Sequence, residues 1–185
     1  MTSPAPAAAE TAVETIAERA ARLAQEILIV DTHIDVPYRL VEHWEDISVR
    51  TEKGDFDFPR AKEGGLDAPF MSIYVPASYQ ETGGAREKAD ELIDMVVKFT
   101  TDWPDKFAVA RSPDDVRANF ERGVISLPMG MENGSPVEGD LDNLGHFHER
   151  MIGLEEAQAK EEAERCMSCG MCFECDNCVI FCPQD

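Results

Sequence analysis

The sequence predicts an α/β fold with a parallel sheet, because short apolar runs and amphipathic segments of helical length follow one another along most of the chain. The predicted order of elements is α, β, β, α, β, α, β, α. The chain has 185 residues, which is enough for one ordinary domain and a small appendage. A hydrophobic fraction of 43% with 8% aromatic residues allows a packed core to form.

The first elements follow from apolar spacing near the N-terminus. Residues 1–10 are small and Pro-bearing, which predicts a flexible leader. Apolar residues recur every three or four positions through 10–26 and predict an amphipathic helix. The β-branched run 27–30 predicts a buried strand that ends near Asp35, because a central strand does not tolerate Pro37.

The middle of the chain contains a polar stretch, an apolar run and a long amphipathic segment. Residues 42–65 are polar and hold several Gly, which predicts a long loop over the surface. The apolar run 69–76 predicts a second strand. Apolar residues fall on one side of 84–103, which predicts a helix that ends before Pro104.

The last predicted elements are two strands and two helices. Residues 107–110 predict a third strand, and Ser112 offers the N-cap of a short helix that ends before Gly123. The apolar run 124–131 predicts a fourth strand. Residues 141–151 predict the last helix of this α/β part.

The charge balance argues against several classes of partner. There are 17 Lys and Arg against 37 Asp and Glu, so the net charge is −20 at pH 7. Such a chain repels nucleic-acid phosphates and anionic membrane surfaces, and we expect neither as a partner. No apolar run approaches the ~18 residues of a membrane span. The N-terminus lacks the basic start and apolar stretch of a secretory signal, so we expect a cytoplasmic protein.

His33, Asp35 and Glu132 are the candidate metal ligands. His33 and Asp35 stand two positions apart at the predicted end of a strand, where such side chains point to the same side. An imidazole and a carboxylate suit zinc, and α/β barrels place their sites at the C-terminal ends of parallel strands. Glu132 ends another apolar strand, and a carboxylate can bridge two divalent cations. The alternative for His33 is a hydrogen-bonded core residue.

Three segments together resemble the membrane dipeptidase family, also called renal dipeptidase. They are VDTHIDVPYRL at 30–40, GGLDAPFMSIYVP at 64–76 and ISLPMGMENGSP at 125–136. The resemblance covers about residues 27–150 and implies a (β/α)8 barrel that hydrolyses dipeptides with a hydroxide held between two zinc ions. It implies that His33 and Asp35 bind one zinc ion and that Glu132 bridges both. All three side chains are then expected to meet at one end of the sheet.

The sequence also departs from the family pattern. The family uses two more metal-binding His and further substrate-binding residues from later strands, which would lie beyond Arg150. His43, His146 and His148 match no such motif, and we interpret them as surface residues. A (β/α)8 barrel needs ~250 residues and eight strands, whereas this part has ~150 residues and about four strands. We therefore expect a truncated barrel with little dipeptidase activity alone and an open sheet edge that favours a homo-oligomer.

All six Cys of the chain form one cluster near the C-terminus. They are Cys166, Cys169, Cys172, Cys175, Cys178 and Cys182. The last four, followed by Pro183, fit the bacterial ferredoxin pattern, while the first three with Gly170 fit the usual C-x2-C-G-x-C opening. The spacing favours a 4Fe–4S cluster over zinc. Disulfides are disfavoured further by the lack of an export signal.

The segment CMSCGMCFECDNCVIFCPQD also resembles the 4Fe–4S segment of glutamate synthase small-subunit-like oxidoreductases, with a charged helix expected before it at 154–165. We therefore expect a leader at 1–10, part of a dipeptidase-like barrel at 11–152 and a ferredoxin-like tail at 153–185. The predicted function is that of a zinc-dependent, dipeptidase-like protein in truncated form. The alternative is a 4Fe–4S electron-transfer protein, or a fragment of an iron–sulfur oxidoreductase, with its own redox partner.

Overall fold

The computed structural model describes residues 14–151 of the chain. The predicted leader at 1–10 lies outside the described residues. The predicted tail at 153–185, with all six Cys and its preceding helix, also lies outside them. No helix among residues 14–151 combines the length and the apolar character needed to cross a membrane.

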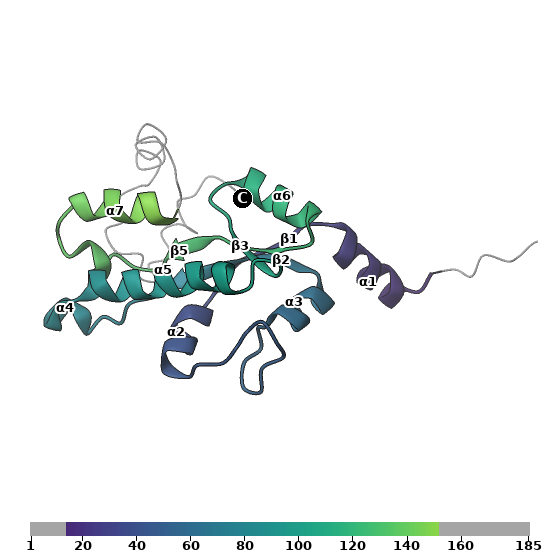
Figure 1. Cartoon of the computed structure of the whole chain (residues 1–185), viewed down its shortest axis with the longest axis horizontal. Coiled ribbons are helices and arrows are strands. Elements are labelled where there is room, and N and C mark those ends of the chain that lie inside the picture. Colours follow the sequence, from purple (N-terminus) through teal and green to yellow (C-terminus); the bar gives the residue numbers. More distant parts are fainter. Residues whose placement is uncertain (1–13, 152–185) are drawn as a thin grey trace, which may run out of the picture.

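The described strands form two parallel sheets (Figure 1), one with the order β1-β2-β5 and one that pairs β3 with β4. Their bounds are β1 Ile29–Ile34, β2 Leu66–Ile73, β3 Phe107–Val109, β4 Ile125–Leu127 and β5 Met129–Met131. Because all pairs are parallel and helices lie between successive strands, the α/β prediction is confirmed. The C-terminal ends of β1, β2 and β5 lie at the same edge of the first sheet.

Pro128 divides the apolar run 124–131 between the two sheets. β4 pairs with β3, whereas β5 pairs with β2. Proline has no N–H to donate to a strand ladder, but the carbonyl oxygen of Pro128 accepts a hydrogen bond from the Met71 N–H at 2.8 Å. The prediction of a single strand here is therefore wrong, because this run changes partners at the proline and links both sheets.

Seven α-helices and one 3-10 helix lie within residues 14–151. Their bounds are α1 Ile16–Glu26, α2 Val36–Glu42, α3 Phe58–Gly64, α4 Tyr79–Thr82, α5 Ala85–Asp102, α6 Pro113–Glu121, η1 Ser135–Val137 and α7 Asp142–Met151. The described parts of the helices expected near 10–26, 84–103, 112–122 and 141–151 are confirmed. Pro37 and Pro59 stand in the first turns of α2 and α3, where a missing N–H costs nothing.

The segment 42–65 is a partly buried segment that ends in α3, not a loop over the surface. Asp57 holds it together: this side chain is 0% exposed and caps α3 by accepting from the Arg60 N–H at 2.9 Å. It also accepts from the Thr51 N–H at 3.0 Å and from the Thr51 hydroxyl at 3.2 Å, and it pairs with the Arg60 guanidinium. Burial raises the pKa of Asp57, but the hydrogen bonds from Arg60 and Thr51 and the charge of Arg60 outweigh burial and lower the pKa.

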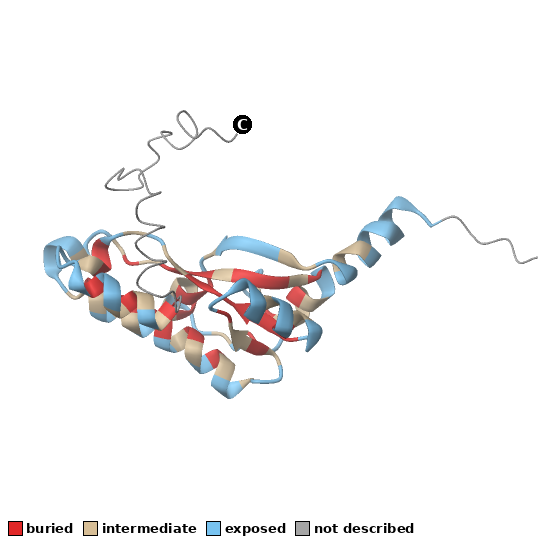
Figure 2. Ribbon diagram, turned by 90° about the horizontal axis from the view of Figure 1, so that it is seen from above, coloured by how far each residue is buried: buried red, intermediate tan, exposed pale blue. Residues whose placement is uncertain are grey.

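The hydrophobic core lies between the strands and α5. Figure 2 shows buried residues gathered along the strands and along one side of the facing helix. The apolar side of α5 is buried as its spacing predicts, through Ala85, Ala89, Leu92, Ile93, Val96 and Phe99. No residue of β1 is buried, so the prediction of a buried first strand is wrong. β1 pairs only with β2 in the described part, and its other edge is open there.

Candidate metal centre

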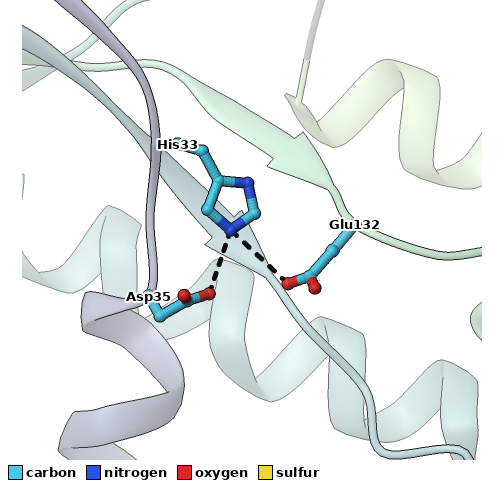
Figure 3. Close-up of side chains that lie close together, drawn as sticks. All are labelled: His33, Asp35 and Glu132. Atoms are coloured by element: carbon cyan, nitrogen blue, oxygen red, sulfur yellow. Dashed lines mark hydrogen bonds and ion pairs between the residues drawn. The ribbon is translucent and has the colours of Figure 1, made fainter. Parts of the chain in front are cut away.

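His33, Asp35 and Glu132 converge at the C-terminal edge of the first sheet (Figure 3). His33 is the penultimate residue of β1, Asp35 follows that strand, and Glu132 follows β5. His33 Nε2 lies 3.2 Å from Asp35 Oδ1 and 3.7 Å from Glu132 Oε2. One ligand atom of each residue lies within 4.8 Å of the other two, and all three residues are exposed. The expected meeting of the three side chains is therefore found, while their binding of a metal stays a prediction.

A bulge in β1 sets the direction of His33. Asp31 pairs with Pro69 and Ile34 pairs with Met71, so β1 has one more residue than β2 over this interval. A bulge of this kind re-aims the side chains next to it. The His33 N–H donates to Asp31 Oδ1 at 3.0 Å inside the bulge. Regular strand alternation, which predicted the pairing of His33 with Asp35, is thus broken where the two side chains meet.

Asp35 occupies the N-cap position of α2 without capping that helix. A capping carboxylate normally accepts from the N–H of the second or third helical residue. The second is Pro37, which has no N–H. The Asp35 side chain makes no capping bond, and its Oδ1 faces His33 Nε2 instead. The local sequence therefore leaves this carboxylate free for the cluster.

Glu132 is fastened to β2 by both its main chain and its side chain. Its N–H donates to the Ile73 carbonyl oxygen at 3.3 Å. Its Oε2 accepts a hydrogen bond from the Ser72 hydroxyl at 2.7 Å, and Ser72 is buried. Sequence reasoning did not select Ser72. The available signal was a single hydroxyl in the apolar run 69–76.

The three side chains fit a divalent metal ion in number, type and spacing. Two ligands that each lie about 2.1 Å from a tetrahedral zinc ion are about 3.4 Å apart. The separations of 3.2 and 3.7 Å around His33 Nε2 match this value. One nitrogen and two carboxylate oxygens leave further coordination positions open, as in catalytic zinc sites. A cavity of about 270 Å³ borders the cluster and is lined partly by Phe70, Met71 and Met131.

The remaining His residues lie outside this cluster. His43 is exposed, as expected. His146 is not a solvated surface residue, because it is only partly exposed and its Nε2 lies 2.8 Å from Asp90 Oδ1. Arg150 pairs with the same carboxylate, so this face of α7 is turned toward α5. His148 is also partly buried, and its Nε2 has no hydrogen-bond partner among residues 14–151.

Comparison with known proteins places this fold and this cluster in one family. The profile of the membrane dipeptidases, peptidase family M19, matches residues 17–173. The chain therefore belongs to the membrane dipeptidase family of metallopeptidases. It is 34% identical over 103 residues to dipeptidase aclJ of Aspergillus oryzae, a match that covers 52% of this chain and 24% of that protein.

Two solved structures share the fold. The crystal structure of dipeptidase AC, a metallopeptidase of family M19, has a TM-score of 0.58 and 28% identity, covering 68% of this chain and 41% of the other. A metallopeptidase of Rhodobacter sphaeroides, liganded with a phosphinate mimic of the dipeptide L-Ala-D-Ala, has a TM-score of 0.57 and 24% identity. That match covers 68% of this chain and 44% of the other. The described residues thus have the TIM-barrel-like α/β fold of M19 dipeptidases.

The chain spans only part of its relatives. It covers 24% to 35% of the length of the first five curated relatives that it matches. The predicted resemblance to dipeptidases is confirmed for the barrel part. The predicted resemblance of residues 166–185 to iron–sulfur oxidoreductases lies outside the described residues and stays a prediction.

Proposed function

We propose that the chain carries the N-terminal part of a zinc dipeptidase active site, in which His33 and Asp35 bind one zinc ion and Glu132 bridges it to a second. The observation that carries this proposal is the convergence of one imidazole nitrogen and two carboxylate oxygens within 4.8 Å at the strand ends. Family membership supports peptide-bond hydrolysis as the reaction. The dipeptide mimic bound to the Rhodobacter sphaeroides relative supports a dipeptide as the substrate.

Each residue of the cluster has a defined role in this proposal. Bound zinc would supply a lowered pKa for water and polarise the scissile carbonyl. His33 offers the Nε2 lone pair when its ring proton is on Nδ1. Asp35 and Glu132 each bring a negative charge, and these charges favour a divalent cation beside Nε2. The neighbouring cavity, with Phe70 and Met131 in its wall, gives apolar contact area beside the cluster.

Zinc binding tests the proposal. The full chain is alkylated at its six Cys, so that no thiolate competes for the ion, and zinc affinity is then measured by competition with a coloured chelator. We expect the wild-type chain to bind zinc and Glu132→Gln to lose at least tenfold in affinity. Glu121→Gln removes an exposed Glu outside the cluster and serves as the matched control. No zinc binding up to millimolar concentration, or equal binding by Glu132→Gln, would contradict the proposal.

Dipeptide hydrolysis is a separate measurement. The described residues supply three ligands, whereas a two-zinc centre needs more. We expect little turnover of L-Ala-D-Ala by the chain alone with added zinc. Robust turnover that Glu132→Gln abolishes would contradict this expectation and would still support the role of the cluster.

We also propose that the six Cys hold a 4Fe–4S cluster that exchanges electrons with a redox partner. The spacing of the thiols supports this proposal. Cys166 belongs to only one of the two competing ligand sets, and Cys175 belongs only to the other. Comparing Cys166→Ser with Cys175→Ser in the anaerobically purified full chain therefore identifies the set. We expect iron, acid-labile sulfide and broad visible absorption, whereas stoichiometric zinc alone would contradict the cluster.

A homo-oligomer is a further proposal. Its support is the open edge of β1 in the described part, where Val30 is 45% exposed. Leu28, Val30 and Phe70 also line an apolar cavity of about 440 Å³ on this sheet. Light scattering during size exclusion should give a dimer or a larger species, and a monomer at all concentrations would contradict it. A cytoplasmic location and the exclusion of nucleic-acid and membrane partners stay predictions from composition.

A further inference from the structure

We propose that Ser72 is a positioning residue that fixes the carboxylate of Glu132 for metal binding. This inference rests on the metal centre proposed above and concerns a residue outside the ligand set. Ser72 lies on β2, one residue before the end of the strand, and its Oγ is 2.7 Å from Glu132 Oε2.

The direction of this hydrogen bond follows from the chemistry of its partners. An ionised carboxylate only accepts, so the Ser72 hydroxyl is the donor. The distance of 2.7 Å is that of a charge-assisted O–H···O bond. Ser72 is 2% exposed, which shields the hydroxyl from competing water. Since a buried hydroxyl is costly without a partner, this bond also explains how a polar group is kept in the strand.

The bond acts on an oxygen that belongs to the cluster. Glu132 Oε2, which accepts from Ser72, is also the oxygen 3.7 Å from His33 Nε2. The Glu132 side chain is otherwise partly exposed and has three rotatable bonds, so a free carboxylate would sample several positions. Ser72 holds Oε2 toward His33 and leaves Oε1 available for another ion.

β2 positions Ser72 and Glu132 together. Ser72 pairs in register with Gly130 of β5, two residues before Glu132. The next residue of β2, Ile73, accepts the Glu132 N–H at 3.3 Å. Consecutive residues of one strand thus hold the side chain and the main chain of Glu132. The position of this carboxylate is therefore set by the sheet before any ion binds.

The test uses zinc affinity in the full chain with its Cys alkylated. Removal of a hydrogen-bond partner behind a metal ligand costs about 10- to 100-fold in affinity, and we expect this loss for Ser72→Ala. Ser72→Thr keeps a hydroxyl and should recover much of the affinity. Ser126→Ala is the matched control, because Ser126 is a buried strand serine whose hydroxyl accepts from Asn119 Nδ2 and contacts no ligand of the cluster.

Urea denaturation of the same variants separates positioning from folding. A purely structural role predicts that Ser72→Ala lowers stability and leaves zinc affinity as in the wild type, which would overturn the inference. Wild-type zinc binding with equal binding by Ser72→Ala overturns the role of Ser72 alone. Failure of the wild-type chain to bind zinc overturns the metal centre and this inference together. Loss in Ser72→Ala with recovery in Ser72→Thr supports it.

Discussion

Replacing Asp57 by Asn is expected to destabilise the fold strongly at neutral pH. The carboxylate accepts four hydrogen bonds from Thr51 and Arg60, with one oxygen on the first turn of α3 and the other on Thr51 and the guanidinium. Asparagine has only one acceptor oxygen, so its NH2 group would face a donor on one side. A buried hydrogen bond to a charged group is worth about 1.5–3 kcal/mol. The loss of one such bond and of the ion pair gives about 3 kcal/mol.

The same substitution has a pH dependence of known sign. The pKa of Asp57 is lowered in the folded protein, so its contribution to stability is complete above the unfolded-state pKa of about 3.9. That contribution is lost as the pH falls through the lower folded-state pKa. The difference in unfolding free energy between wild type and Asp57→Asn should therefore be largest near pH 7 and shrink below pH ~4.

Urea denaturation followed by tryptophan fluorescence measures this difference. The two Trp of the chain, Trp44 and Trp103, both contact Phe99, so their emission reports on the core. Asp114→Asn removes an exposed carboxylate and should change the free energy of unfolding by less than 0.5 kcal/mol, as is usual for surface sites. A loss below about 1 kcal/mol for Asp57→Asn, or a loss that does not change between pH 7 and pH 3, would refute this reasoning.

Three further substitutions test the packing and the helix ends by urea denaturation. Phe99→Ala empties a fully buried site on α5 and should cost about 3–5 kcal/mol and change the Trp emission. Ser112→Ala removes the capping box of α6 and should cost about 1 kcal/mol. Gly65→Ala should cost about 2 kcal/mol, because Gly65 has a φ of +78° and a Cβ there would meet the Ala24 carbonyl oxygen. Wild-type stability in any variant would contradict its assigned contact.

Local sequence predicted those elements whose signals are local. The apolar spacing over 84–103 predicts a helix, and α5 runs over Ala85–Asp102. Partner choice is a tertiary property, so an apolar run alone does not show that Pro128 divides it between two sheets. The burial of β1 likewise depends on its neighbours, and the described part provides a neighbour on one side only. α3 was missed because its polar sequence hid its Asp57 N-cap and its early proline.

The same division holds for the candidate site. His33, Asp35 and Glu132 were found because each follows or ends an apolar run, and the ends of parallel strands share one edge. Ser72 was missed because its partner is 60 residues away, and no periodicity reports such a bond. The contact of His146 with Asp90 spans 56 residues and was missed for the same reason.

The central claim is that His33, Asp35 and Glu132 hold a divalent metal ion, and anomalous diffraction at the zinc edge tests it most directly. Crystals of the Cys-alkylated full chain are soaked in zinc, and data are collected on both sides of the edge. We predict a peak about 2.0–2.2 Å from His33 Nε2 and from a carboxylate oxygen of Asp35 and of Glu132. Zinc ordered elsewhere on the chain, with His33 still bonded to Asp35 and no peak between these side chains, would contradict the account.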